Sequence, residues 1–142
     1  MPKKILIIKS SSMGDIVHAL PVAYDIKKHY PDCELSWVVE ESFTDIPKLS
    51  PFVDKLVVTA FRRWRKNIFS SSVRGEILAV RRALAEAKYD IVIDLQGLIR
   101  TAVVARWAGV ESVGYSKENI KEPLAAHFYS RTLPVSNKLV PV

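Results

Sequence analysis

The sequence is poor in the residues that form disulfides, metal centres and glycine-rich nucleotide loops. Its 142 residues include one cysteine, three histidines and five glycines. The lone Cys33 excludes an internal disulfide and fits a reducing compartment. Neither His29 nor His127 has partners at the spacing of metal ligands, so we expect no metal and no cofactor. The glycines do not form the G-x-G-x-x-G pattern, which argues against a dinucleotide pyrophosphate site.

The sequence also lacks a long hydrophobic run. Its first apolar segment, residues 5–8, is flanked by lysines and is too short for a signal-peptide core or a membrane span. We therefore expect a cytosolic chain. With 49% hydrophobic residues, a chain of 142 residues can bury one core, and nothing in its composition indicates two complete domains.

Positive charge is in excess and unevenly spread. The chain has 21 lysines and arginines against 15 aspartates and glutamates, a formal net charge of +6. This balance favours an anionic partner, namely a nucleic acid, a phosphorylated small molecule or an acidic membrane surface. The densest cluster is Arg62, Arg63, Arg65 and Lys66.

Short apolar runs alternate with helical patterns along the chain. The clearest helical pattern covers about residues 72–88, where Val73, Ile77, Val80, Leu84 and Ala87 share one face. The alternation predicts an α/β fold with a Rossmann-like, doubly wound and mostly parallel sheet. Strands are predicted at residues 5–8, 35–39, 55–58, 91–93 and 112–115.

The turn after the first predicted strand is the most informative segment. It places Asp15 between a buried strand and an amphipathic helix, where open α/β sheets hold their ligands. Gly14 allows a ligand to approach the backbone, and the free N–H groups of the first helical turn point into the same space. An anion or a polar sugar could bind there. The alternative is that Ser11, Ser12 and Asp15 only cap the helix.

The basic segment 61–69 follows the third predicted strand, so it should leave the sheet at the same edge as Asp15. Arginine binds phosphate and carboxylate oxygens in a bidentate manner, so this segment could hold an anionic substrate. One alternative is a solvated basic loop with Trp64 tucked into the core. Another is a nucleic-acid surface, on which aromatic rings stack on bases. No further basic and aromatic stripe follows, so we expect no nucleic-acid partner.

Two other acidic segments end predicted strands. Asp94 and Gln96 follow the fourth strand and could contact a ligand, or Asp94 could cap the next helix. Glu40 and Glu41 close the second strand. Without a glycine fingerprint beside them, we expect these two carboxylates to have a surface role or to start a helix.

Five segments spread over nearly the whole chain resemble the lipopolysaccharide heptosyltransferase I family. They are KSSSMGDIVHALP (9–21), WVVEE (37–41), RRWRK (62–66), DLQGL (94–98) and KEPL (121–124). Enzymes of this family transfer L-glycero-D-manno-heptose from ADP-heptose to the Kdo sugar of the lipid A inner core. They have the GT-B fold, in which two Rossmann-like domains face each other across a cleft.

The resemblance implies that residues 1–142 are the amino-terminal, acceptor-binding domain of such an enzyme. The carboxyl-terminal domain that would bind ADP-heptose is then absent, and the chain alone is expected to be inactive. Residues 133–142 carry two prolines and no clear final element, which indicates an interrupted linker. The lipid-linked acceptor implies peripheral contact with the cytoplasmic face of the bacterial inner membrane. The competing hypothesis is a non-enzymatic binding module for a phosphorylated or nucleic-acid ligand.

The resemblance also assigns roles to residues. Asp15 would be the general base that deprotonates the Kdo hydroxyl in an inverting transfer. Lys121 departs from the arginine usual before Glu-Pro-Leu, and lysine keeps the charge but loses the planar fork. The substrate-binding residues implied are Ser12, Met13, Gly14, Arg62, Arg63, Arg65, Lys66, Gln96 and Lys121.

Overall fold

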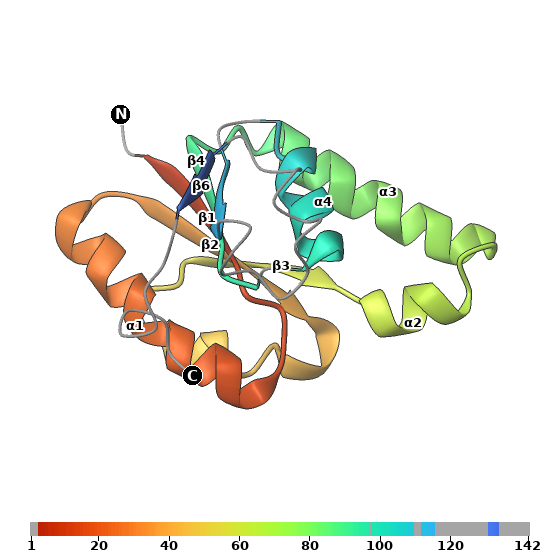
Figure 1. The fold of residues 1–142 in the computed structure, drawn as a ribbon, viewed down its shortest axis with the longest axis horizontal. Coiled ribbons are helices and arrows are strands. Elements are labelled where there is room, and N and C mark those ends of the chain that lie inside the picture. Colours follow the sequence, from red (N-terminus) through yellow and green to blue (C-terminus); the bar gives the residue numbers. More distant parts are fainter. Residues whose placement is uncertain (1–2, 97, 110–111, 116–130, 134–142) are drawn as a thin grey trace.

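The structure is a computed structural model, and it describes residues 3–96, 98–109, 112–115 and 131–133. Strands and helices alternate through most of this part of the chain (Figure 1). Lys121 and residues 134–142 lie outside the described residues. The elements are β1 (Lys4–Ile8), α1 (Met13–His29), β2 (Glu34–Glu40), η1 (Glu41–Phe43), η2 (Pro47–Leu49), β3 (Lys55–Thr59), α2 (Phe61–Lys66), α3 (Ser71–Glu86), β4 (Ile91–Asp94), α4 (Ile99–Trp107), β5 (Ser112–Tyr115) and β6 (Arg131–Leu133).

The strands of the described part form one sheet of six strands in the order β3-β2-β1-β4-β5-β6. Every neighbouring pair is parallel. In the register of the central strands, Ile7 of β1 lies between Trp37 of β2 and Ile93 of β4. The chain first builds outward from β1 to β3 and then returns to the other side of β1 at β4. This reversal is the switch point of a doubly wound fold, so the predicted fold class is confirmed.

The central strand is buried on both faces. Ile5 and Ile7 pack with the α1 residues Ile16, Ala19 and Ala23. Leu6 and Ile8 pack on the opposite face with side chains of α3 and α4. Helix α1 therefore covers one face of the sheet, and α3 and α4 cover the other (Figure 1). Such two-sided burial explains why the strand sequences are continuous apolar runs rather than alternating ones.

The five predicted strands and the long amphipathic helix are all found. Helix α3 spans Ser71–Glu86, and it buries Val73 and Leu84 on the predicted face. Partly buried Ile77 and Val80 lie on the same face and pack beside these residues. The periodicity of the sequence thus located this helix because one of its faces packs on the sheet.

The short elements that were not predicted include α2, β6 and the 3-10 helix η2. Residues 61–66, expected as a basic loop, form helix α2, whose start depends on a side chain from another strand, as described below. Residues 131–133 form strand β6, so Leu133, which we placed at the start of a linker, ends a strand instead. A segment of three residues followed by a proline is too short to show a strand pattern.

Asp54, which directly precedes β3, links this strand to α1 and β2 near the amino ends of the strands. Its Oδ2 atom accepts a hydrogen bond of 2.7 Å from Lys27 Nζ of α1 and one of 2.8 Å from the Leu35 N–H of β2. Burial disfavours the charged carboxylate, but these hydrogen bonds outweigh that effect and lower the pKa of Asp54 below its ordinary value. The ionised form therefore stabilises the fold.

We expect the Asp54→Asn variant to lose roughly 1 kcal/mol of unfolding free energy at pH 7, a modest figure because the carboxylate is partly exposed and screened. Since the folded pKa is depressed, the contribution is complete above the unfolded pKa of about 4 and disappears as the pH falls through the folded pKa. Urea unfolding at neutral and acidic pH measures it, with Asp25→Asn, an exposed site on α1, as the control. A deficit of equal size at both pH values would contradict this role.

Candidate functional site

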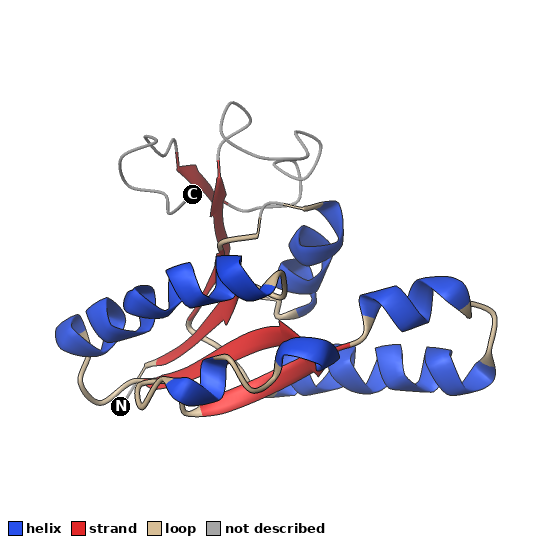
Figure 2. Cartoon of the chain, turned by 90° about the horizontal axis from the view of Figure 1, so that it is seen from below, coloured by secondary structure: helices blue, strands red, loops and turns tan. Residues whose placement is uncertain are grey.

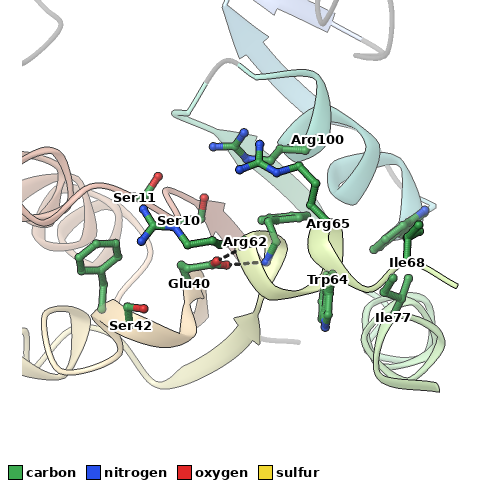
Figure 3. A pocket seen from close by; sticks show the side chains of 13 residues that line it. Ser10, Ser11, Glu40, Ser42, Arg62, Trp64, Arg65, Ile68, Ile77 and Arg100 are labelled. Atoms are coloured by element: carbon green, nitrogen blue, oxygen red, sulfur yellow. Dashed lines mark hydrogen bonds between the residues drawn. The ribbon is translucent and has the colours of Figure 1, made fainter. Parts of the chain in front are cut away.

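A cavity of about 800 Å³ lies where the carboxyl ends of β1 and β2 meet helices α2, α3 and α4 (Figure 3). Its position is the switch point of the sheet, where open α/β folds bind ligands. Its size suits a sugar or a similar small molecule. The lining residues are Ser10, Ser11, Glu40, Ser42, Phe43, Phe61, Arg62, Trp64, Arg65, Ile68, Ile77, Arg100 and Trp107.

Glu40 is a buried carboxylate that starts helix α2. It ends β2, is 9% exposed, and its Oε1 atom accepts hydrogen bonds of 3.0 Å from Thr59 Oγ1 and from the Phe61 N–H. Its Oε2 atom accepts one of 3.2 Å from the Arg62 N–H (Figure 3). The residue at the N-cap of α2 is Ala60, which has no side-chain acceptor. Glu40 therefore does not have the surface role that was one expectation. The other expectation, a helix start, is confirmed, because Glu41 begins η1 with Glu40 as its N-cap residue, and the Glu40 side chain also caps α2.

Helix α2 divides the basic cluster between two sides. Arg62 and Arg65 line the cavity, whereas Arg63 does not. Arg63 forms ion pairs with Glu76 at 2.6 Å and with Glu41 at 3.2 Å. Hydrogen bonds to Glu76 first and Glu41 second raise the pKa of the Arg63 guanidinium above its ordinary value. Arg63 thus joins α2 to α3 and η1.

Trp64 and Lys66 complete the predicted basic segment. Trp64 is buried and its ring meets that of Phe61 edge-on at 5.6 Å, so the part of the loop alternative that placed Trp64 in the core is confirmed. Lys66 is exposed and does not line the cavity. Of the four basic residues singled out by the sequence, the structure therefore brings two to the cavity.

The turn before α1 adjoins the cavity. Ser10 and Ser11 line it, and Ser12, Met13, Gly14 and Asp15 follow directly on the chain. The half-buried Asp15 accepts hydrogen bonds at Oδ2 from the Ser12 N–H (3.4 Å) and the Ser12 hydroxyl (3.2 Å), so these two residues contribute to capping α1.

The start of α1 leaves space for a ligand. Met13 and Gly14 are exposed there. A Cβ atom added to Gly14 would meet nothing within 4 Å. The described residues therefore leave the space beside Gly14 open.

Gln96 holds this turn in place. It is 4% exposed, and its Oε1 atom accepts hydrogen bonds from the Ser10 N–H (3.2 Å) and the Ser11 N–H (3.4 Å). The Gln96 N–H in turn donates to Asp94 Oδ1 at 2.8 Å. The structure thus places Gln96 behind the turn and not on the cavity wall, where it orients Ser10 and Ser11.

Arg100 was not predicted from the sequence as a site residue. It lies in the first turn of α4 and lines the cavity opposite α2 (Figure 3), with its guanidinium carbon 5.8 Å from the centre of the Phe61 ring. Its position after the fourth parallel strand was the available signal, because that strand ends at the same edge as β1. Three guanidinium groups and several aromatic rings now face one space, which suits an anionic ligand with an apolar face.

The described residues contain neither a cluster of metal ligands nor a helix that could span a membrane. No group of three metal-ligating side chains occurs among them. Within the same ranges, no helix combines the length and the apolar character needed to cross a membrane.

Removing the Glu40 carboxylate leaves one hydroxyl and two backbone N–H groups without their acceptor. We expect Glu40→Ala to lower the free energy of unfolding by roughly 2 kcal/mol, measured by urea denaturation. Glu40→Gln, which keeps one oxygen acceptor, should recover part of the loss. The neighbouring exposed ion-pair residue is the control, and Glu41→Ala should cost less than about 1 kcal/mol. Equal losses in the two alanine variants would show that Glu40 is not the cap of α2.

Comparison with known proteins finds similarity over nearly the whole chain. Residues 77–141 match the model of the family described as glycosyltransferase family 9 (heptosyltransferase). The chain is 40% identical over 134 residues to lipopolysaccharide heptosyltransferase 1 of Pseudomonas aeruginosa, covering 94% of this chain and 38% of that protein. It is 43% identical over 129 residues to the Salmonella typhimurium protein of the same name, covering 90% of this chain and 41% of the relative.

The chain is also similar to a heptosyltransferase of known structure. The structure of Escherichia coli heptosyltransferase WaaC with ADP-2-deoxy-2-fluoro heptose superposes with a TM-score of 0.89 at 40% identity, covering 95% of this chain and 43% of that chain. This chain therefore spans about two fifths of the length of the relatives it matches. Over that span, the resemblance predicted from five short motifs is confirmed, because the chain is similar in sequence and in fold to lipopolysaccharide heptosyltransferases.

Proposed function

We propose that this chain is the acceptor-binding part of an inverting GT-B heptosyltransferase. In this proposal it binds the Kdo sugar of the lipid A inner core, and ADP-heptose binds to a separate nucleotide-sugar domain. The observation that carries the proposal is the cavity lined by Arg62, Arg65 and Arg100 beside the Asp15 turn. The likeness to heptosyltransferases supplies the reaction class.

The chemistry of the acceptor matches the cavity. Kdo carries a carboxylate, and phosphates are attached to the inner core and lipid A. Arg62 and Arg65 stand one helical turn apart on α2, so both guanidinium groups can face one ligand. Arg100 adds a third positive group from α4. Planar guanidinium groups bind such oxyanions through paired hydrogen bonds, and we assign them to holding the acceptor.

Asp15 is proposed as the general base. The oxygen of the Kdo hydroxyl forms a bond to the anomeric carbon of heptose, the bond from that carbon to ADP breaks, and the hydroxyl proton passes to the Asp15 carboxylate. The positive end of α1 favours negative charge at this position. A modest base is sufficient, because the hydroxyl loses its proton only as the new bond forms, and such catalysis contributes roughly 10²- to 10⁴-fold. No metal and no cofactor take part in this scheme.

The lipid-linked acceptor would place the protein at the cytoplasmic face of the inner membrane as a peripheral protein. The excess of positive charge in the chain is favourable at an anionic surface.

Calorimetric titration of this chain with a soluble Kdo-containing inner-core acceptor tests the proposal. ADP-heptose and a single-stranded oligonucleotide are titrated in parallel, and circular dichroism verifies that the sample is folded. We expect selective binding of the acceptor. Binding of the oligonucleotide alone, or no binding by a folded sample, would contradict the proposal and favour a binding module of another kind.

The arginines of the cavity should determine this affinity. Arg62→Ala and Arg65→Ala are each expected to weaken acceptor binding roughly tenfold or more, because each removes charged hydrogen bonds. The effect should decrease with added salt, since exposed charges are screened over about 10 Å at 0.1 M. Arg82→Ala is the matched control, because Arg82 is exposed on α3 and does not line the cavity. An equal loss of acceptor affinity in the Arg82→Ala variant would show that binding depends only on the net charge of the chain and not on the arginines of the cavity.

If Asp15 is the general base, its substitution should affect the transfer rate and not the affinity for the acceptor. Once a matching nucleotide-sugar domain is supplied, Asp15→Asn should lower the transfer rate roughly 10²- to 10⁴-fold while acceptor affinity stays nearly constant. Asp25→Asn, an exposed position on the same helix, should retain the rate. A near-normal rate in the Asp15→Asn variant would eliminate the assignment.

A further inference from the structure

The turn between α2 and α3 carries an unusually exposed aromatic side chain. Phe69 is 84% exposed, the highest value among the large hydrophobic residues of the described chain, and its neighbour Ile68 is 47% exposed. Helices α2 and α3 extend together away from the sheet, and this turn forms their outer end (Figures 1 and 2). Adjacent apolar side chains at a projecting tip are typical of an interaction surface.

Positive charge surrounds this tip. Residues 61–75 contain five basic residues and no aspartate or glutamate. Arg63 is paired with carboxylates and Arg65 lines the cavity, but Lys66 and Arg74 are exposed outside it. The Arg74 guanidinium carbon lies 6.0 Å from the centre of the Phe69 ring. The tip therefore combines an exposed apolar end with a basic collar.

We propose that this tip, Ile68 and Phe69 with their basic collar, docks the protein on an anionic lipid bilayer. The two apolar side chains enter the boundary between headgroups and acyl chains, where an aromatic ring leaves water. The basic side chains remain at the level of the headgroups and bind their phosphates. Because the collar contains no carboxylate, nothing in residues 61–75 repels an anionic surface.

The tip adjoins the candidate site. Ile68 lines the cavity together with Arg65, so one end of the cavity reaches the base of the tip. Docking would bring the cavity to the surface on which a lipid-linked sugar is presented. This consequence rests on the proposed function, but the lipid contact itself does not, and the two can be tested separately.

Co-sedimentation with vesicles tests the docking surface. We expect the chain to bind vesicles of equal parts phosphatidylglycerol and phosphatidylcholine and to bind pure phosphatidylcholine much less. Phe69→Ser should lower the partition coefficient about tenfold, and Arg74→Ala about fivefold. The matched control is Leu49→Ser, because Leu49 is 72% exposed on η2, outside the tip. Full binding by the Phe69→Ser variant, or equal loss in the control, would overturn the proposal.

A tryptophan at the tip reports insertion directly. Brominated lipids should quench the added emission of the Phe69→Trp variant, whereas the added emission of the Leu49→Trp variant should be unaffected. No quenching would overturn the proposal, as would a tip that binds a single-stranded oligonucleotide but no vesicle. Phe69→Ser should leave the affinity for the soluble acceptor unchanged. Failure of vesicle binding with intact acceptor binding would therefore reject the docking surface and retain the proposed function.

Discussion

The parallel direction of every strand pair in the described sheet is the constraint on which the site depends. Because all carboxyl ends reach the same edge, segments distant in sequence leave the sheet side by side. At the carboxyl ends of the strands, further backbone hydrogen bonds hold together the segments that leave the sheet. The Glu40 N–H donates to the Ser10 carbonyl at 3.0 Å, and the Leu95 N–H donates to the Ile8 carbonyl at 2.9 Å. The turn before α1, the cap of α2 and the Gln96 turn therefore lie at the same edge of the sheet.

Glu40 connects this edge to the charge pattern of the cavity. A buried carboxylate is costly unless donors surround it, and here a hydroxyl and two backbone N–H groups do so. A six-residue helix has little stability alone, so α2 depends on this cap and on the burial of Trp64. Once formed, α2 directs Arg62 and Arg65 to the cavity and Arg63 to Glu41 and Glu76. One buried carboxylate thus divides the basic cluster into residues that line the cavity and a residue that forms ion pairs with Glu41 and Glu76.

The fold was largely predictable because its signals are local. The apolar run Ile5–Ile8 must be buried, and the apolar face of α3 must pack against other residues, in any fold of this chain. The details of the site were less predictable, because they depend on contacts between distant residues. Nothing in the sequence near residue 61 shows that Glu40 caps α2, and nothing near Gln96 shows that it supports Ser10. Arg100 was missed because it stands alone in the sequence and joins the arginines of α2 only through the sheet order.

The central claim is that an acidic sugar binds at this edge of the sheet. The most direct measurement is a map of backbone amide chemical-shift changes as a soluble Kdo-containing acceptor is added to the isotopically labelled chain. We predict that the changes concentrate on residues 10–15, on α2 and on the first turn of α4. Changes confined to the distant surface of α1 formed by Val22, Asp25, Ile26, His29 and Tyr30, or none at saturating acceptor, would contradict the account.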